Sequence, residues 1–284
     1  MQYERVVIVG VGLLGGSVGL ALHARRLART VVGVGRHEAQ LRSAQQRGAV
    51  DEYSLNLVEA SRGADLAVIC TPVQQIVEKV TTCAGSMAQD GLITDVGSTK
   101  SNICKAIAAK GLVDQFGNGP AFCGAHPLAG SEKSGVEFAD SELFEDKIAV
   151  ITPLQCSAAV ADRTERFWQL LGSQTVRMTP DAHDQAIART SHLPHVVASA
   201  LAGATPSDVL PLVASGWRDT TRVAAGNVEM WRQIVSENRK SVLESLQEFS
   251  RSLESWIQAL ENGSDEQIEY LLDAGKKKRD AVGN

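Results

Sequence analysis

The chain opens with the stretch that decides its fold, Val6-Val7-Ile8-Val9-Gly10-Val11-Gly12-Leu13-Leu14-Gly15-Gly16-Ser17. Its four leading apolar residues predict a strand buried on both faces of a parallel sheet. A Gly-x-Gly-x-x-Gly turn follows, and residues 18–27 predict a helix. Strand, glycine turn and helix in this order are typical of a dinucleotide-binding unit, whose helix N-terminus offers N–H groups and a positive dipole to phosphates.

Each glycine of this turn has a physical role. Gly10 permits the tight turn, Gly12 lets a pyrophosphate approach the backbone, and Gly15 lets the helix pack close to the sheet. The alternatives are an ordinary glycine-rich turn and a membrane segment. Residues 6–22 are apolar, but they include five glycines among 17 residues and are short for a membrane span.

The composition is that of an ordinary globular protein. The chain has 284 residues, enough for two domains, with 44% apolar and 21% charged residues. A net charge of −5 argues against nucleic acid as the main partner. Five scattered cysteines form no C-x-x-C pair, and no secretory signal precedes the first strand, so we expect a cytoplasmic protein with reduced thiols and no membrane contact.

Strands and helices alternate through the first part of the chain, which implies a mainly parallel sheet. The further strands are expected at residues 31–34, 65–70, 92–95, 121–123, 148–152 and 175–178. The helices between them are expected at residues 38–48, 73–87, 101–110 and 157–171. The sequence therefore predicts an α/β Rossmann-like nucleotide-binding domain over residues 1–178.

Residues 179–284 show no strand pattern and predict an all-α domain. Residues 237–260 carry a heptad seam, which consists of Val242, Leu246, Phe249, Leu253, Trp256 and Leu260. This seam could be buried within its own subunit or form a dimer interface, and we favour dimerisation. The basic run at residues 276–279 is interpreted as a solvated terminal turn.

A second cluster of chemically capable residues follows the predicted strands. His126 comes after the strand at 121–123, and Ser98 comes after the strand at 92–95. Because ligands bind beyond the carboxyl ends of such strands, His126 is a candidate general base that a hydroxyl such as Ser98 could orient. The alternative is that His126 only caps the turn before Pro127.

Two further groups lie in the helical half. His192 and His195 flank Leu193-Pro194, but no third ligand stands out, so we expect no metal site. Arg218 and Arg222 are close in sequence, and a guanidinium can bind a carboxylate through two parallel hydrogen bonds. Arg218 could instead form a surface ion pair with Asp219.

Five ordered motifs resemble the prephenate/arogenate dehydrogenases of tyrosine biosynthesis, over essentially the whole chain. They are Gly10-Val-Gly-Leu-Leu-Gly-Gly-Ser17, Asp95-Val-Gly-Ser-Thr-Lys100, Gly124-Ala-His-Pro-Leu-Ala-Gly130, Ser191-His-Leu-Pro-His195 and Gly216-Trp-Arg-Asp-Thr-Thr-Arg222. The resemblance implies a nucleotide-binding domain followed by a helical domain that forms a homodimer. It also implies oxidative decarboxylation of a cyclohexadienol, with hydride passing to a nicotinamide.

The resemblance assigns roles to individual residues. His126 would accept the hydroxyl proton, with Ser98 in the same site, and Arg222 would bind a substrate carboxylate. The substrate pocket would be completed by His195, Glu132, Ser131 and Trp231. The cofactor contacts that we expect are Gly10, Gly12, Leu13, Leu14, Gly15, Arg36, Thr71 and Pro72. His183 and His192 match family positions without a firm role.

Cofactor and substrate are the finer questions. The second predicted strand has no acidic residue at its end that would repel the 2′-phosphate of NADP, and Arg36, which stands there, could pair with that phosphate. NADP is therefore favoured over NAD. The alternative is that Arg36 is solvated or stacks on the adenine, which would suit either cofactor. Prephenate carries a keto acid in its side chain, whereas arogenate carries an ammonium. His195 can donate a hydrogen bond to the keto acid, so prephenate is favoured, although the carboxylate of Glu132 could instead bind the ammonium of arogenate. The alternatives are a hydride-transfer enzyme of the 3-hydroxyacid dehydrogenase or imine reductase type, and a nucleotide-sensing protein without catalysis.

Overall fold

The computed structural model describes residues 1–112, 119–130 and 133–283. Packing divides the chain into two compact units, residues 1–238 and residues 239–284. The change from α/β to purely helical structure comes at Pro180, inside the first unit. A domain boundary between residues 178 and 179 therefore marks a change of structural class, and it stays our proposal.

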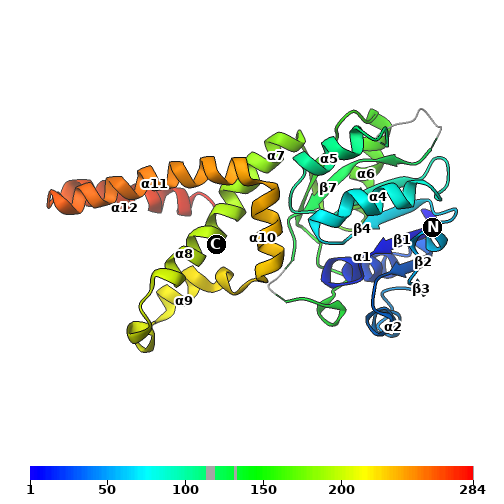
Figure 1. Ribbon diagram of the computed structural model, residues 1–284, viewed down its shortest axis with the longest axis horizontal. Helices are drawn as coiled ribbons and strands as arrows, with labels where there is room; N and C mark the ends of the chain where they lie inside the picture. The colour runs from blue at the N-terminus through cyan, green and yellow to red at the C-terminus, as the bar shows by residue number, and fades with distance from the viewer. Residues whose placement is uncertain (113–118, 131–132, 284) are drawn as a thin grey trace. The chain divides into compact units, whose positions relative to one another are not determined.

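The first unit contains a six-stranded parallel sheet in the order β3-β2-β1-β4-β5-β6 (Figure 1). Its strands are β1 (Tyr3–Val9), β2 (Ala28–Val34), β3 (Glu52–Ser54), β4 (Leu66–Ile69), β5 (Leu92–Asp95) and β6 (Ala121–Phe122). This is the strand order of dinucleotide-binding sheets, whose ligand crevice lies where the order reverses, here between β1 and β4. The predicted Rossmann-like fold is confirmed.

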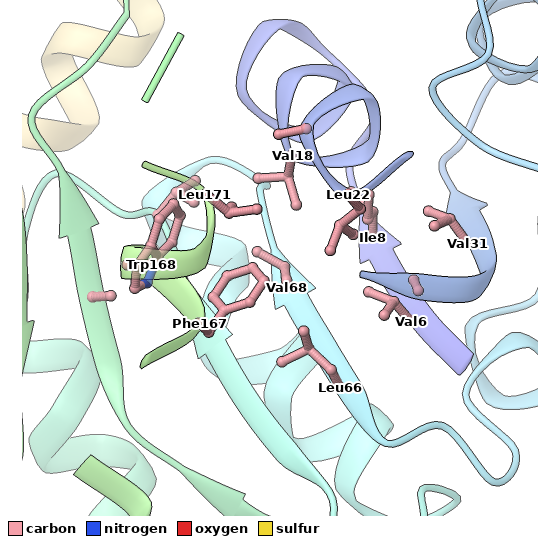
Figure 2. Close-up of a cluster of buried hydrophobic side chains, with 14 of the residues drawn as sticks. Val6, Ile8, Val18, Leu22, Val31, Leu66, Val68, Phe167, Trp168 and Leu171 are labelled. Atoms are coloured by element: carbon pink, nitrogen blue, oxygen red, sulfur yellow. The ribbon is translucent and has the colours of Figure 1, made fainter. Parts of the chain in front are cut away.

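Helices cover both faces of this sheet. They are α1 (Leu13–Ala24), α2 (Glu38–Gln46), α3 (Leu57–Ala60), α4 (Ile76–Ala84, after the short turn η1, Val73–Gln75), α5 (Ser101–Ala108) and α6 (Ala158–Leu170). Successive residues of β1 point to opposite faces. Val6 and Ile8 pack in a cluster with Val18 and Leu22 of α1 and Phe167 and Trp168 of α6 (Figure 2). Val7 and Val9 pack in a second cluster, with residues of α4 and α5.

A second, smaller sheet follows, in the order β7-β8-β9. It consists of β7 (Gly124–Pro127), β8 (Ile148–Thr152) and β9 (Gln174–Arg177), and β7 runs antiparallel to β8. Residues 124–127 had been expected only to follow a strand. A stretch of four residues that includes a glycine and a proline shows no strand pattern in the sequence. These residues form a strand because they pair with β8. The short turn η2 (Val136–Phe138) lies between β7 and β8.

Some other boundaries also differ from expectation. Helix α1 begins at Leu13 rather than Val18. Its first turns contain Gly15 and Gly16, which weaken the helical pattern in the sequence but allow close packing in the structure. The short elements β3 and α3 were not expected. Neither were three of the helices, α9 (Ser215–Thr221), α10 (Val228–Glu237) and α12 (Asp265–Asp280).

The rest of the first unit is helical. Its elements are α7 (Pro180–Ile187), the π-helical turn η3 (Ala188–His192), α8 (Leu193–Ala204), η4 (Ser207–Leu212), α9, η5 (Arg222–Ala225) and α10 (Val228–Glu237). Helix α7 begins at Pro180, three residues before the start expected at residue 183, because Thr179 accepts a hydrogen bond from the Ala182 N–H at 3.2 Å and Pro180 occupies the first turn.

The second unit consists of α11 (Arg239–Glu261) and α12, which contact each other. Along the heptad seam of α11, Leu253 and Leu260 are 47% and 64% exposed in the single chain. The basic run at residues 276–279 lies in the last turns of α12, where Lys277 pairs with Asp273 at 2.7 Å on the surface. Basic residues at this end of a helix also interact favourably with its dipole.

Candidate active site

A cavity of about 690 Å³ lies at the carboxyl ends of β1, β2 and β4. One wall is the turn Val9 to Gly12, and another is the start of α2 with Arg36 and His37. The turn Cys70 to Pro72 and the segment Ser134 to Glu137 complete its lining. The cavity therefore occupies the crevice in which dinucleotides bind to sheets of this order.

Three glycines give this cavity its shape. Gly10 has φ +93°, and a Cβ there would lie 2.7 Å from the carbonyl oxygen of Cys70. A Cβ at Gly15 would lie 2.0 Å from the carbonyl oxygen of Gly10, so α1 packs directly on the turn. A Cβ at Gly12 would meet nothing within 4 Å, which leaves open space beside the N-terminus of α1. A dinucleotide pyrophosphate fits this arrangement of open backbone and helix N-terminus.

The expected cofactor residues divide into two groups. Gly10, Gly12, Arg36, Thr71 and Pro72 line the cavity. Leu13, Leu14 and Gly15 form the first turn of α1 behind it. The hydroxyl of Thr71 is buried with no hydrogen-bond partner among the described residues, so it is available to a ligand. The individual contacts with the cofactor stay predictions.

His126 on β7 forms a hydrogen-bonded pair with His183 on α7. The distance from His126 Nδ1 to His183 Nε2 is 2.9 Å, and the two rings meet edge to face with centroids 5.1 Å apart. The strand register places His126 opposite Val150 of β8. The sequence suggested that a hydroxyl such as that of Ser98 orients the His126 ring. In the structure, Nδ1 of His126 is hydrogen-bonded to a second histidine, His183.

Asp184 determines which ring nitrogens carry protons. Its Oδ1 lies 2.8 Å from His183 Nδ1. A carboxylate only accepts, so His183 carries its proton on Nδ1 and accepts at Nε2. His126 must then donate through Nδ1, which leaves the lone pair of its Nε2 free to accept a proton. The tautomer follows from the hydrogen bonds, as in other carboxylate–histidine pairs.

Burial keeps both imidazoles neutral. It lowers the pKa of His126 well below its usual value, and the neighbouring His183, Lys100 and His192 lower it further when they carry positive charge. The pKa of His183 is lowered mainly by burial, although the carboxylate of Asp184 acts in the opposite direction. A neutral His126 with a free lone pair is able to act as a general base.

His195 and Trp231 form a stacked pair, with ring centroids 3.6 Å apart and planes 10° apart. Nδ1 of His195 is buried without a hydrogen-bond partner in the described part of the chain. Burial also lowers the pKa of His195, so the ring is neutral at neutral pH. It can still donate or accept a hydrogen bond, which suits a residue that lines a substrate pocket.

His192 lies near both the His126–His183 pair and the His195–Trp231 pair. It lies in the π-helical turn, 6.2 Å from Trp231 between ring centroids, and burial lowers its pKa to about 4. The amide nitrogen of Asn238 lies 3.2 Å from His192 Nδ1 and donates at 2.7 Å to the carbonyl oxygen of Asp184. The π-turn, a feature frequent at functional sites, thus brings His192 and His195 to the same region as His183.

The other expected substrate residues are placed as follows. Arg222 begins η5 and is exposed, as is Arg218 on α9. Ser98 lies half-buried in the turn after β5. Ser131 and Glu132 lie outside the described residues. The roles of all five stay predictions.

Sequence reasoning missed three residues of this site. His183 was noticed but given no role, and Asp184 and Asn238 were not singled out. The usable signal was the adjacent pair His183-Asp184 shortly after the cap Thr179-Pro180, because a carboxylate next to a histidine in sequence can orient its ring.

Neither a metal site nor a membrane span is found in the described residues. No group of three or more histidine, cysteine, aspartate or glutamate side chains there could hold a metal ion. No helix among them combines the length and the hydropathy that crossing a membrane requires.

The sheet order and the cavity at its switch point are those of a dinucleotide-binding fold, and the neutral histidine pair adds a candidate general base, as expected for a nicotinamide-dependent oxidoreductase. Residues 18–177 match the family model described as "Prephenate dehydrogenase, nucleotide-binding domain", and residues 179–274 match "Prephenate dehydrogenase, dimerization domain". The chain belongs to the prephenate dehydrogenase family.

Three similar proteins illustrate this membership. The prephenate dehydrogenase of Bacillus subtilis (strain 168) is 30% identical over 98% of this chain and 76% of its own length. The crystal structure of prephenate dehydrogenase from A. aeolicus with hydroxyphenyl propionate and NAD+ has 28% identity and a TM-score of 0.89, covering 99% of both chains. Synechocystis arogenate dehydrogenase has 30% identity and a TM-score of 0.81, covering 98% of this chain and 100% of its own.

Proposed function

We propose that this protein is a prephenate dehydrogenase that catalyses the NAD(P)-dependent oxidative decarboxylation of prephenate to 4-hydroxyphenylpyruvate. The observation that carries the proposal is the chain Asp184–His183–His126, which ends in a free imidazole lone pair on the strand that follows the nucleotide-binding sheet. The names of the similar proteins support the substrate.

The proton balance of this reaction assigns two steps to His126. The bound nicotinamide supplies the acceptor for the hydride that leaves the carbinol carbon. As that C–H bond breaks, His126 Nε2 accepts the hydroxyl proton and the carbinol becomes a carbonyl. The bond to the ring carboxylate then breaks, CO2 leaves, and its electron pair makes the ring aromatic. The former carbonyl oxygen recovers a proton from His126, so no proton is released overall.

The neighbours of His126 assist both steps. Asp184 carries a negative charge at the far end of the chain, which stabilises the positive charge that His126 and His183 share while they hold the extra proton. Arg222 would bind a substrate carboxylate, and His195, stacked on Trp231, would contact the side chain. Burial of the pair excludes water from competing for this proton.

The test is an absorbance assay at the reduced nicotinamide band, run with prephenate and arogenate and with NAD and NADP. We expect cofactor reduction and an aromatic product. Folded protein that binds the nucleotide but reduces it with neither substrate would disprove the enzymatic function and leave a nucleotide-sensing protein.

For the cofactor we propose a preference for NADP. Arg36 and His37 line the cavity where β2 ends, and the nearby acid Glu38 pairs with Arg42 at 2.7 Å. Glu137 lines the same cavity, and its negative charge would oppose the binding of a 2′-phosphate. Arg36→Ala should therefore reduce kcat/KM with NADP selectively, whereas Glu137→Gln should not. A wild-type kcat/KM roughly tenfold higher with NAD, about 1.4 kcal/mol, would overturn the preference.

For the substrate we propose that prephenate is preferred over arogenate. Because His195 is neutral, it selects by donating a hydrogen bond to the keto acid rather than by repelling the ammonium of arogenate. His195→Ala should lower the ratio of the two kcat/KM values. An unchanged ratio would remove His195 as the selecting residue.

We also propose a cytoplasmic homodimer. The dimer is supported by the description of residues 179–274 as a dimerization domain and by the exposed seam residues Leu246, Leu253 and Leu260 of α11. Sedimentation equilibrium should give a mass of twice 30.3 kDa.

A further inference from the structure

Two buried charged side chains lie where the chain passes from the parallel sheet to the smaller one. Lys100 and Asp95 form an ion pair, and both side chains are fully buried. Asp95 Oδ1 accepts the N–H of Ala125 at 3.1 Å, and Lys100 Nζ donates to the carbonyl oxygen of Ala125 at 3.0 Å. The pair therefore satisfies both backbone groups of the residue that precedes His126.

The ladder with β8 holds β7 within the smaller sheet, and these two bonds add a link between β7 and the end of β5. β5 and β7 belong to different sheets, so backbone pairing with β5 does not fix β7. Asp95 ends β5, and its Oδ2 also accepts the N–H of Gly97 at 2.9 Å, which shapes the turn that carries Ser98. The same carboxylate thus sets the positions of two residues expected in the reaction.

Lys100 also reaches the histidine pair through its own backbone. Its N–H donates to Asp184 Oδ1 at 2.8 Å, and the N–H of Ser101 donates to Asp184 Oδ2 at 2.9 Å. Asp184 in turn orients His183, which holds His126. Lys100 therefore fixes the backbone beside His126 with its side chain and the orienting carboxylate with its amide.

A buried ion pair is a weak source of net stability, because removing both charges from water costs about as much as their attraction returns. An apolar pair could fill the same space but could not bond both groups of Ala125. We propose that the Asp95–Lys100 pair is a positioning device for His126 that also sets the electrostatic balance at the histidine pair. This inference rests on the proposed role of His126 as the base.

The electrostatic part follows from the charges around the two rings. The titratable groups that act on the two rings are Lys100, Asp95, Asp184 and His192. Burial lowers the pKa of His192 to about 4, so His192 is neutral at neutral pH. The charged groups near the rings are then Lys100, which is positive, and Asp95 and Asp184, which are negative. Loss of one member of the Asp95–Lys100 pair should therefore shift the pKa of His126 in a direction set by the charge removed.

The experiment compares Lys100→Met, Asp95→Asn and the double variant. The pKa of His126 is read by NMR in histidine-labelled full-length protein, assigned with His126→Asn, and kcat is measured in parallel. We expect Lys100→Met to raise the pKa by roughly one unit, because an unpaired carboxylate remains. Asp95→Asn should not raise it, and the double variant should leave it near the wild-type value.

The double variant is the one expected to keep the fold, since it removes both charges together. Its kcat should still fall by roughly tenfold or more with little change in KM, because the Ala125 carbonyl loses its donor and β7 shifts. A double variant with the wild-type kcat would overturn the positioning role, and shifts of the same sign in both single variants would overturn the electrostatic one. If the wild type is inactive, the proposed function fails, while the NMR comparison still tests the pair.

Discussion

The cofactor cavity and the histidine site differ in what forms them. Three short turns, residues 9–12, 34–37 and 70–72, contribute to the lining of the cavity, and each of them is continuous in sequence. The histidine site consists of side chains, and its two hydrogen-bonded rings are 57 positions apart. A site made of contiguous backbone should be sensitive to an added Cβ atom. A site made of distant side chains should be sensitive to loss of a single hydrogen-bonding group.

The largest effect is expected at the end of the histidine chain. His126→Asn keeps a polar side chain of similar size but removes the lone pair that accepts the proton. We expect kcat to fall by roughly 10²–10⁴, the usual contribution of a positioned general base. Steady-state kinetics at saturating cofactor and substrate measures this.

The matched controls are the affinity for the nucleotide and the unfolding temperature, both of which should be unchanged in His126→Asn. An unchanged kcat would show that His126 is not the base. The histidine site would then not depend on a single hydrogen-bonding group, as the comparison with the cofactor cavity requires.

A smaller effect is expected at the substrate carboxylate. Arg222→Ala should raise KM at least about tenfold, because a charge-assisted hydrogen bond contributes roughly 1.5–3 kcal/mol. Arg218→Ala is the matched control, since Arg218 is also exposed and lies on the preceding helix. Equal effects of the two substitutions on KM would show that Arg222 is not the specific anchor.

The smallest effects are expected in the glycine turn, where two neighbouring positions should respond differently. Gly12→Ser places its side chain in open space and keeps a good N-cap, so stability is retained while the dissociation constant of the nucleotide rises roughly tenfold. Gly15→Ala forces a Cβ against the Gly10 carbonyl and should cost about 1–3 kcal/mol of unfolding free energy.

Calorimetric binding and thermal unfolding of both proteins separate these outcomes. If Gly12→Ser bound the nucleotide as well as the wild type, the pyrophosphate would lie elsewhere in the cavity.

The sequence predicted local features well. β1, the glycine turn, β5 and the change of class at Thr179-Pro180 follow from apolar runs, glycine spacing and capping residues, each contained within a few positions. β7 could not be predicted, because four residues with glycine and proline become a strand only by pairing with β8.

The histidine site was predictable only in part. His126 was found because it follows a strand, but its partner is selected by packing of α7 against the α/β part. The role of Asp184 depends on the amides of Lys100 and Ser101, more than 80 positions earlier in the chain. No periodicity or spacing encodes such a contact.

The pH dependence of kcat/KM, measured with the preferred substrate at saturating cofactor, tests the central claim most directly. Burial lowers the pKa of His126 well below its usual value, and the base must be unprotonated to act. Activity should therefore remain constant from neutral pH down past the ordinary histidine pKa of about 6.5, and it should decline only at lower pH. A decline already centred at or above pH 6.5 would contradict a buried, neutral His126 as the base.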